Sequence, residues 1–184
     1  LAQAGFTAAG NALDGEIGYL ALYGGKEDVA PALATLGVAP LEIDAIGIDI
    51  KKYPCCYATH RALDGMLALR SAHQLEPRHV DSVEVVTSAG GLEALAYANP
   101  QSGLEAKFSM EYAMAAALLD GEIQLSSFED AKVTRPQIQA LMARVRTSAS
   151  SGNVLPRWVT VKVHLADGKT LERHVTMARG DAGD

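Results

Sequence analysis

The stretch that decides the fold class is "RWVTVKVHLADGKTLERHVTM", residues 157–177. On each side of Asp167-Gly168, apolar and polar residues alternate with the period of two that a half-buried β-strand shows. Asp-Gly favours a tight hairpin turn, because these two residues tolerate the positive φ angles that such a turn needs. The stretch therefore predicts two antiparallel strands near the end of the chain.

Three further segments favour extended structure. Residues 79–90, "HVDSVEVVTSAG", are rich in valine, a β-branched residue that is common in strands. In residues 42–50, "EIDAIGIDI", isoleucines alternate with small or acidic residues, which also predicts a strand. Residues 130–133 are interpreted as a short extended piece. The tail "ARGDAGD", residues 178–184, is expected to be loose.

Four segments show helix signals between the strands. The longest is apolar, follows a Ser102–Glu105 capping box and ends at Gly121. Another has Pro136 at its first position, which proline favours because the amide there needs no partner. The four segments are residues 26–37, 55–73, 102–121 and 135–146.

Helices and strands alternate without a regular β-α-β spacing, and the closing hairpin is antiparallel. This order predicts an α+β fold, a two-layer α/β domain with antiparallel strands and packed helices, over residues 38–184. Residues 1–37 are rich in Ala and Gly and predict only short helices, which need another surface to pack on.

Composition excludes some classes of function. The chain has 184 residues, a net charge of −6 and a pI near 5.3, which argues against nucleic acid as a partner. No apolar run approaches the roughly 18–20 residues that cross a bilayer, so no membrane partner is expected. The two cysteines are adjacent and offer no disulfide framework, which favours a reducing, cytoplasmic location.

The densest group of reactive residue types is "IDIKKYPCCYATHRALD", residues 48–64. Cys56 and His60 have the spacing of two ligands on one helix face, but two ligands do not make a metal site. Adjacent cysteines lack the spacer of a redox motif, and no oxyanion hole is identifiable for a Cys-His nucleophile. We therefore expect no metal and interpret both cysteines as packing residues.

Proton transfer is the remaining chemistry for this segment. Lys51 lies where the isoleucine-rich segment ends, and His60 has Asp64 four residues further on, able to orient its ring. A lysine ammonium with an oriented imidazole suits an anionic substrate that has a weakly acidic C–H bond. The alternative is that Lys51 and Lys52 are solvated and that the His-Asp pair lies on a helix surface.

A second cluster is "SGLEAKFSMEY", residues 102–112. Lys107 is predicted in the first turn of its helix, where exposed amides and a cation can hold a carboxylate together. The alternative is an ordinary Lys107–Glu111 pair. Phe108 is expected in the core, and Tyr112 half-buried.

Together the two clusters resemble the MmgE/PrpD family, which includes 2-methylcitrate dehydratase, cis-aconitate decarboxylase and iminodisuccinate epimerase. "IKKYPCCYATHRALDGMLAL" is similar to the K-x-[YF]-P block with a histidine six residues after the proline. "SGLEAKFSMEYAMAAALLDG" resembles the K-F-S-x-x-Y helix, and "VTVKVHLADGKTLERHV" the closing hairpin. The resemblance implies that residues 1–37 end a helical domain and that residues 38–184 are the smaller α+β domain.

The resemblance also implies an activity. Family members act on di- or tricarboxylic acids without a metal or organic cofactor, so we expect a lyase, in particular a 2-methylcitrate dehydratase of propionate catabolism. Lys51 and His60 are then the catalytic candidates, and Lys107, Tyr53 and Tyr112 the substrate-binding candidates. A homodimer is expected. The segment alone is expected to be inactive, because the family's helical domain supplies further acid and base residues.

Two alternatives stay open on the sequence. Epimerisation and decarboxylation begin with the same demand on the substrate, so the residues do not separate them from dehydration. The chain could also belong to a non-catalytic module that binds carboxylates or pairs with another subunit.

Overall fold

The computed structural model describes residues 2–16, 18–23, 30–34 and 36–183. The chain divides into two compact units, Leu1–Gly47 and Ile48–Asp184, and each is described by itself. No helix of the described residues is long and apolar enough to cross a membrane.

The first unit contains short helices only among its described residues: η1 (Ala2–Ala4), α1 (Tyr19–Tyr23), α2 (Ala30–Leu33) and α3 (Glu42–Ala45). The helix predicted over 26–37 is seen as α2, while residues 26–29 lie outside the described part. The strand predicted over 42–50 is wrong, because its first half forms α3 and the rest is irregular. Ile43 and Ile46 are three residues apart, which is a helical rather than an extended spacing. The assignment of residues 1–37 to a helical domain stays a prediction.

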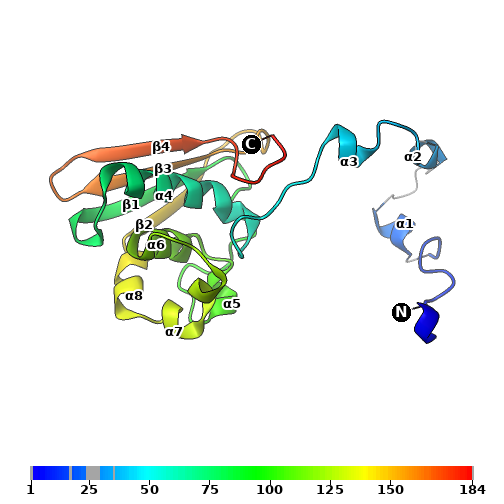
Figure 1. Ribbon diagram of the computed structural model, residues 1–184, viewed down its shortest axis with the longest axis horizontal. Helices are drawn as coiled ribbons and strands as arrows, with labels where there is room; N and C mark the ends of the chain where they lie inside the picture. Colours follow the sequence, from blue (N-terminus) through cyan, green and yellow to red (C-terminus); the bar gives the residue numbers. More distant parts are fainter. Residues whose placement is uncertain (1, 17, 24–29, 35, 184) are drawn as a thin grey trace. The chain divides into compact units, whose positions relative to one another are not determined.

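The second unit is built on a four-stranded sheet (Figure 1). Its strands are β1 (Val80–Thr87), β2 (Val145–Ala149), β3 (Val159–Leu165) and β4 (Thr170–Val175), in the spatial order β2-β1-β3-β4. β1 pairs with β3, and β3 with β4, in antiparallel register, whereas β2 pairs parallel to β1. The predicted hairpin is confirmed, with Gly168 at a φ of +87° in its turn. The predicted α+β class is confirmed as well.

The helices of this unit follow the predicted order with three corrections. They are η2 (Tyr57–Thr59), α4 (His60–His73), η3 (Pro77–His79), α5 (Gly103–Ala106), α6 (Met110–Asp120), η4 (Leu125–Phe128), α7 (Asp130–Val133) and α8 (Pro136–Met142). The extended piece predicted at residues 130–133 is a helical turn. The helix predicted over 135–146 ends at Met142, and its last residues enter β2, because pairing with the distant β1 overrides local helix propensity.

The single helix predicted over 102–121 is two helices, α5 and α6. The Ser109 side chain accepts a hydrogen bond from the Tyr112 amide at 3.1 Å, which begins α6 as a new helix. Ser102 caps α5 in the same way by accepting from the Glu105 amide at 3.3 Å. Residues 107–109 therefore form a break between the two helices, and this break matters for the site.

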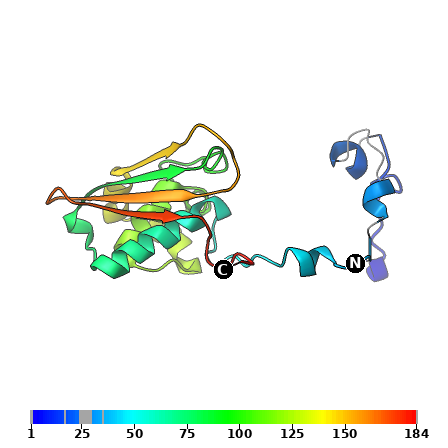
Figure 2. The same ribbon diagram turned by 90° about the horizontal axis from the view of Figure 1, so that it is seen from above.

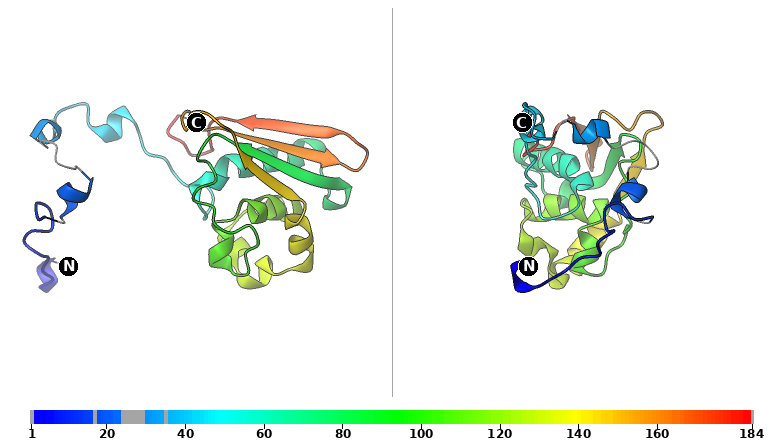
Figure 3. Two further views of the ribbon diagram at one scale, coloured as in Figure 1. Left: turned by 180° about the vertical axis from the view of Figure 1, so that it is seen from behind. Right: turned by 90° about the vertical axis from the view of Figure 1, so that its right-hand side faces the viewer.

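α4 and α6 cover one face of the sheet (Figures 2 and 3). Their inner side chains pack with the valines of β1 and β3 into one core. Gly65 allows a close approach of α4 to the sheet, since a Cβ there would lie 3.1 Å from Val161 Cγ2. The opposite face is polar, with Glu84 beside Lys162 and His164.

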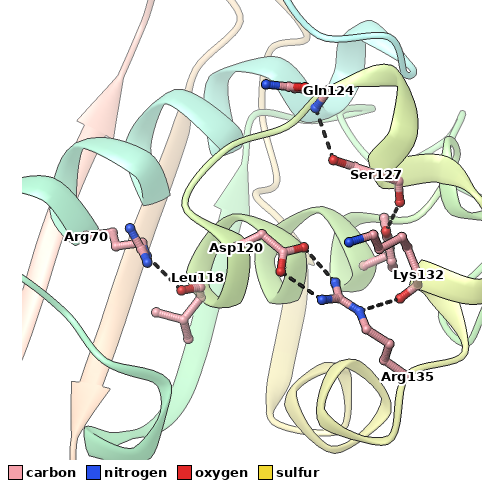
Figure 4. Close-up of polar contacts among 8 residues, drawn as sticks. Arg70, Leu118, Asp120, Gln124, Ser127, Lys132 and Arg135 are labelled. Carbon is pink, nitrogen blue, oxygen red and sulfur yellow. Dashed lines mark hydrogen bonds and ion pairs between the residues drawn. The ribbon is translucent and has the colours of Figure 1, made fainter.

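Polar contacts also hold the helical layer together (Figure 4). Arg70 Nε on α4 donates to the Leu118 carbonyl of α6 at 2.9 Å. Arg135 donates to both carboxylate oxygens of Asp120 at 2.9 and 2.6 Å, and to the Lys132 carbonyl at 3.0 Å. These contacts hold the C-terminal end of α6 to α4 and to the residue before α8.

Candidate functional site

The two lysines singled out in the sequence line the same pocket. It has a volume of about 410 Å³ and is lined by Lys51, Pro54, Cys55, Cys56, Lys107 and Phe108. A backbone hydrogen bond from the Cys56 amide to the Lys107 carbonyl, 2.9 Å long, brings the two distant segments together. No acidic side chain is among the lining residues.

Neither pocket lysine is in an ion pair within the part of the chain that the structure describes. Lys51 Nζ makes one long contact, 3.5 Å, with the Cys55 carbonyl, so most of its donor capacity faces the pocket and solvent. The Lys107–Glu111 pair, which the sequence left open as the alternative, is not formed. Glu111 instead accepts from Thr147 at 3.2 Å and from Ser109 at 3.5 Å.

The break between α5 and α6 sets the position of Lys107 and Phe108. Lys107 is the C-cap residue immediately after α5 rather than part of the first turn of a long helix, and its side chain is half-buried. Phe108 is 38% exposed and lines the pocket, so its expected place in the core is wrong. The capping serine turns the chain at this point and directs both residues away from the core.

His60 is fully buried at the start of α4 and does not line the pocket. Its ring lies between those of Tyr53 and Tyr57, with centroid distances of 5.2 and 4.8 Å. Neither ring nitrogen has a hydrogen-bond partner among the described residues. Burial lowers the pKa of His60 below its ordinary value, and the positive charge of Lys51 acts in the same direction. The imidazole is therefore neutral at neutral pH.

Asp64 does not orient His60, as the sequence suggested, but binds Tyr53. The Tyr53 hydroxyl donates to Asp64 Oδ1 at 2.6 Å, and the Arg179 amide donates to Oδ2 at 2.8 Å. Burial and this hydrogen bond raise the pKa of Tyr53. Tyr53 is only 3% exposed and does not line the pocket.

Tyr112 is also outside the pocket lining. It is fully buried rather than half-buried, and its hydroxyl donates to the Ser127 carbonyl. Burial raises the pKa of Tyr112 to about 12. The structure thus brings Lys51 and Lys107 together and leaves Tyr53, Tyr112 and His60 buried outside the pocket lining.

The adjacent cysteines differ in their surroundings. Cys55 is 6% exposed, its Sγ lies 3.2 Å from Thr59 Oγ1, and burial raises its pKa to about 11. Cys56 is partly exposed and lines the pocket. Sequence reasoning took both for packing residues and missed Cys56. Neighbours in extended chain point to opposite sides, and that alternation could have shown that only one of them faces the core.

Metal binding is not supported by the geometry. Across the described ranges, no group of three or more His, Cys, Asp or Glu side chains is close enough to hold a metal ion. The pocket instead offers the ammonium groups of Lys51 and Lys107, which suit carboxylate oxygens. A buried imidazole, that of His60, lies outside its lining.

Comparison with known proteins places this α+β unit in a family. Residues 53–184 match the MmgE/PrpD C-terminal domain, and the chain belongs to the MmgE/PrpD family. It is 27% identical over 179 residues to human cis-aconitate decarboxylase, covering 92% of this chain and 36% of that protein.

The mouse cis-aconitate decarboxylase is 30% identical over 137 residues, covering 70% of this chain and 28% of that protein. The chain spans about a third of the length of these curated relatives. The family therefore includes lyases, and the predicted family is confirmed.

Proposed function

We propose that this chain is part of a cofactor-independent lyase for a di- or tricarboxylic acid, and that Lys51 and Lys107 bind two of the substrate's carboxylates. The observation that supports this best is the convergence on one pocket of two lysines that have no acidic partner in the described part of the chain. Cations inside a folded protein are normally paired or fully solvated, and two that share a concave site favour an anionic ligand.

The pocket suits a small acid in size and charge. Ligand sites commonly measure roughly 300–1,000 Å³, and this pocket lies at the lower end of that range. Ammonium–carboxylate hydrogen bonds are about twice as strong as neutral ones, which gives the site both affinity and orientation. Phe108 adds an apolar surface against the carbon skeleton.

The reaction proceeds through negative charge next to a carboxylate. Dehydration and epimerisation remove a proton there, and decarboxylation leaves an electron pair on the same carbon. The Lys51 ammonium stabilises that charge electrostatically. His60 is neutral and can accept a proton, but it does not line the pocket, so we assign it to proton holding rather than to direct contact with the substrate.

Among these reactions, we propose dehydration of the 2-methylcitrate type first. Decarboxylation is the second candidate, because both relatives named above are cis-aconitate decarboxylases. Identities of 27–30% do not transfer the reaction of one member to another. The homodimer and the cytoplasmic location stay predictions, as does the non-catalytic alternative.

The test is to incubate the intact protein in D₂O with 2-methylcitrate, cis-aconitate and a series of dicarboxylates, and to follow the products by proton NMR. A new olefinic signal from 2-methylcitrate supports dehydration, loss of a carboxyl carbon supports decarboxylation, and exchange alone supports epimerisation. Lys51→Met and Lys107→Met should each reduce turnover at least tenfold, by loss of a charge-assisted bond worth roughly 1.5–3 kcal/mol.

Lys169→Met is the matched control for these variants. Lys169 lies in the exposed hairpin turn, paired with Asp167 at 3.1 Å, far in sequence from both pocket segments. Turnover should be unchanged in this variant. If no acid in the series reacts, or if both pocket variants keep full turnover, the proposed function fails.

A further inference from the structure

The C-terminal segment is bound to α4 and to the residues just before Lys51 rather than loose as expected from the sequence. Residues 176–182, here called the C-terminal strap, lie beside the chain segment that leads into α4 (Figures 1 and 2). Ala178 within the strap is fully buried. This segment is held by tertiary contacts, which its polar, glycine-containing sequence does not predict.

One set of strap contacts fixes the residues immediately before Lys51. The Ile50 amide donates to the Gly180 carbonyl at 2.7 Å. The Ala182 amide donates to Asp49 Oδ1 at 2.9 Å. Residues 49 and 50 lie in no helix or strand, so these bonds replace the ones that regular structure would supply.

A second set joins the strap to α4. Arg61 Nε donates to the Thr176 carbonyl at 2.9 Å, and its guanidinium pairs with Asp181 at 3.2 Å. Both side chains of this pair are only 14% exposed. Asp181 also accepts from the Ala178 amide at 3.1 Å, which closes the strap on itself.

A third contact reaches the residues after Lys51. The Arg179 amide donates to Asp64 Oδ2, while Asp64 Oδ1 accepts from the Tyr53 hydroxyl. The strap thus holds the backbone on both sides of Lys51, at residue 50 directly and at residue 53 through Asp64.

We propose that the strap positions Lys51 for the carboxylate in the pocket, with Gly180 and Asp181 as its positioning residues. The inference rests on the proposed function, because it needs Lys51 to act on an anion. Lys51 is exposed and makes one long hydrogen bond of its own, so its location depends on the backbone to which it is attached. Releasing the strap frees residues 49–51 and takes the ammonium group away from the pocket.

Two glycines provide a matched pair for the test. Gly180 has a φ of +89° and Gly168 a φ of +87°, so an alanine at either position is strained in the same way. A Cβ at Gly180 would overlap the Ile50 carbonyl oxygen, whereas a Cβ at Gly168 meets no atom within 4 Å. Gly180→Ala therefore displaces the segment before Lys51, and Gly168→Ala does not.

The readout is the alkylation of Cys56, which lines the same pocket. In both reactions the thiolate displaces iodide, but iodoacetate is an anion and iodoacetamide is neutral. The rate with iodoacetate divided by the rate with iodoacetamide therefore reports the local positive charge, because thiol accessibility affects both rates alike. Trypsin releases both cysteines in the peptide 53–61, and fragmentation between them separates Cys56 from Cys55.

In the intact protein, Lys51→Met should lower this ratio roughly threefold, as expected for one charge at about 6 Å in water. Gly180→Ala and Asp181→Asn should lower the ratio nearly as much. When either is combined with Lys51→Met, the ratio should fall no further than in Lys51→Met alone. Gly168→Ala should leave it unchanged. Asp181→Asn keeps the test valid if Gly180→Ala does not fold.

The outcomes separate the two proposals. If Lys51→Met lowers the ratio while Gly180→Ala and Asp181→Asn keep the wild-type value, the strap does not position Lys51 and the pocket proposal stands. If neither Lys51→Met nor Lys107→Met changes the ratio, the lysines create no anion site, and the proposed function and this inference are both overturned.

Discussion

The arginine of the helical layer and the two lysines of the pocket differ in whether an acidic side chain binds them. In the helical layer, Arg135 binds Asp120 through two hydrogen bonds, and this pairing raises the pKa of the guanidinium (Figure 4). In the pocket, Lys51 and Lys107 have no acidic partner within the described residues. The paired arginine stabilises the fold, whereas the unpaired lysines are available to a ligand. Substitutions that remove one kind or the other should therefore affect different properties.

The largest effect on stability is expected from Asp64→Ala, which breaks the buried contact behind the pocket. Asp64 is 8% exposed and accepts from both Tyr53 and the Arg179 amide. Its removal leaves both donors without their partner, which should lower the free energy of unfolding by about 3 kcal/mol. Urea unfolding measures this loss. A loss below that of an exposed-surface variant such as Lys169→Ala would show that the contact contributes nothing.

A smaller effect is expected from Arg135→Met, which tests the paired side of the comparison. The pair with Asp120 is partly buried, so its loss should cost roughly 1–2 kcal/mol of unfolding free energy. Lys51→Met and Lys107→Met should leave that free energy within about 0.5 kcal/mol of the wild type. Equal losses in all three variants would remove the distinction between structural and ligand-binding cations.

The pH dependence of stability gives a finer test at His60. Burial places its folded pKa below the ordinary value of about 6.5, so the unfolded chain takes up the proton more readily. Stability is then fully present above pH 6.5 and is lost as the pH falls through the folded pKa. His60→Phe should flatten this slope, which unfolding curves at a series of pH values will show. An unchanged slope would assign the acid sensitivity to other groups.

The sequence predicted most of the second unit from local patterns. The hairpin at Asp167-Gly168, the first strand and the helix after Pro54 all follow from short-range periodicity and turn chemistry, and the structure confirms them. β2 was missed because its partner β1 lies about sixty residues earlier in the chain, and no local pattern encodes that pairing. The strand predicted over 42–50 was wrong because Ile43 and Ile46 have a helical spacing, and the first half of the segment forms α3.

In the candidate site, too, local motifs predicted some features, and the others depend on tertiary contacts. The motifs identified Lys51 and Lys107, but that they share one pocket depends on the Cys56–Lys107 backbone bond and on the break before Ser109. The sequence also could not show that Asp64 binds Tyr53 instead of His60, because the choice depends on tertiary contacts. The proposed role of the strap could not be predicted either, because the composition of this segment is typical of a loose tail.

The most direct test of the central claim is the affinity of the intact protein for tricarballylate, an unreactive tricarboxylate, measured by titration calorimetry. Wild type, Lys51→Met, Lys107→Met and the control Lys169→Met should be compared at one ionic strength. Our prediction is that each pocket substitution raises Kd at least tenfold, corresponding to about 1.4 kcal/mol, and that the control does not. A Kd that stays within about twofold of the wild type in both pocket variants would contradict it.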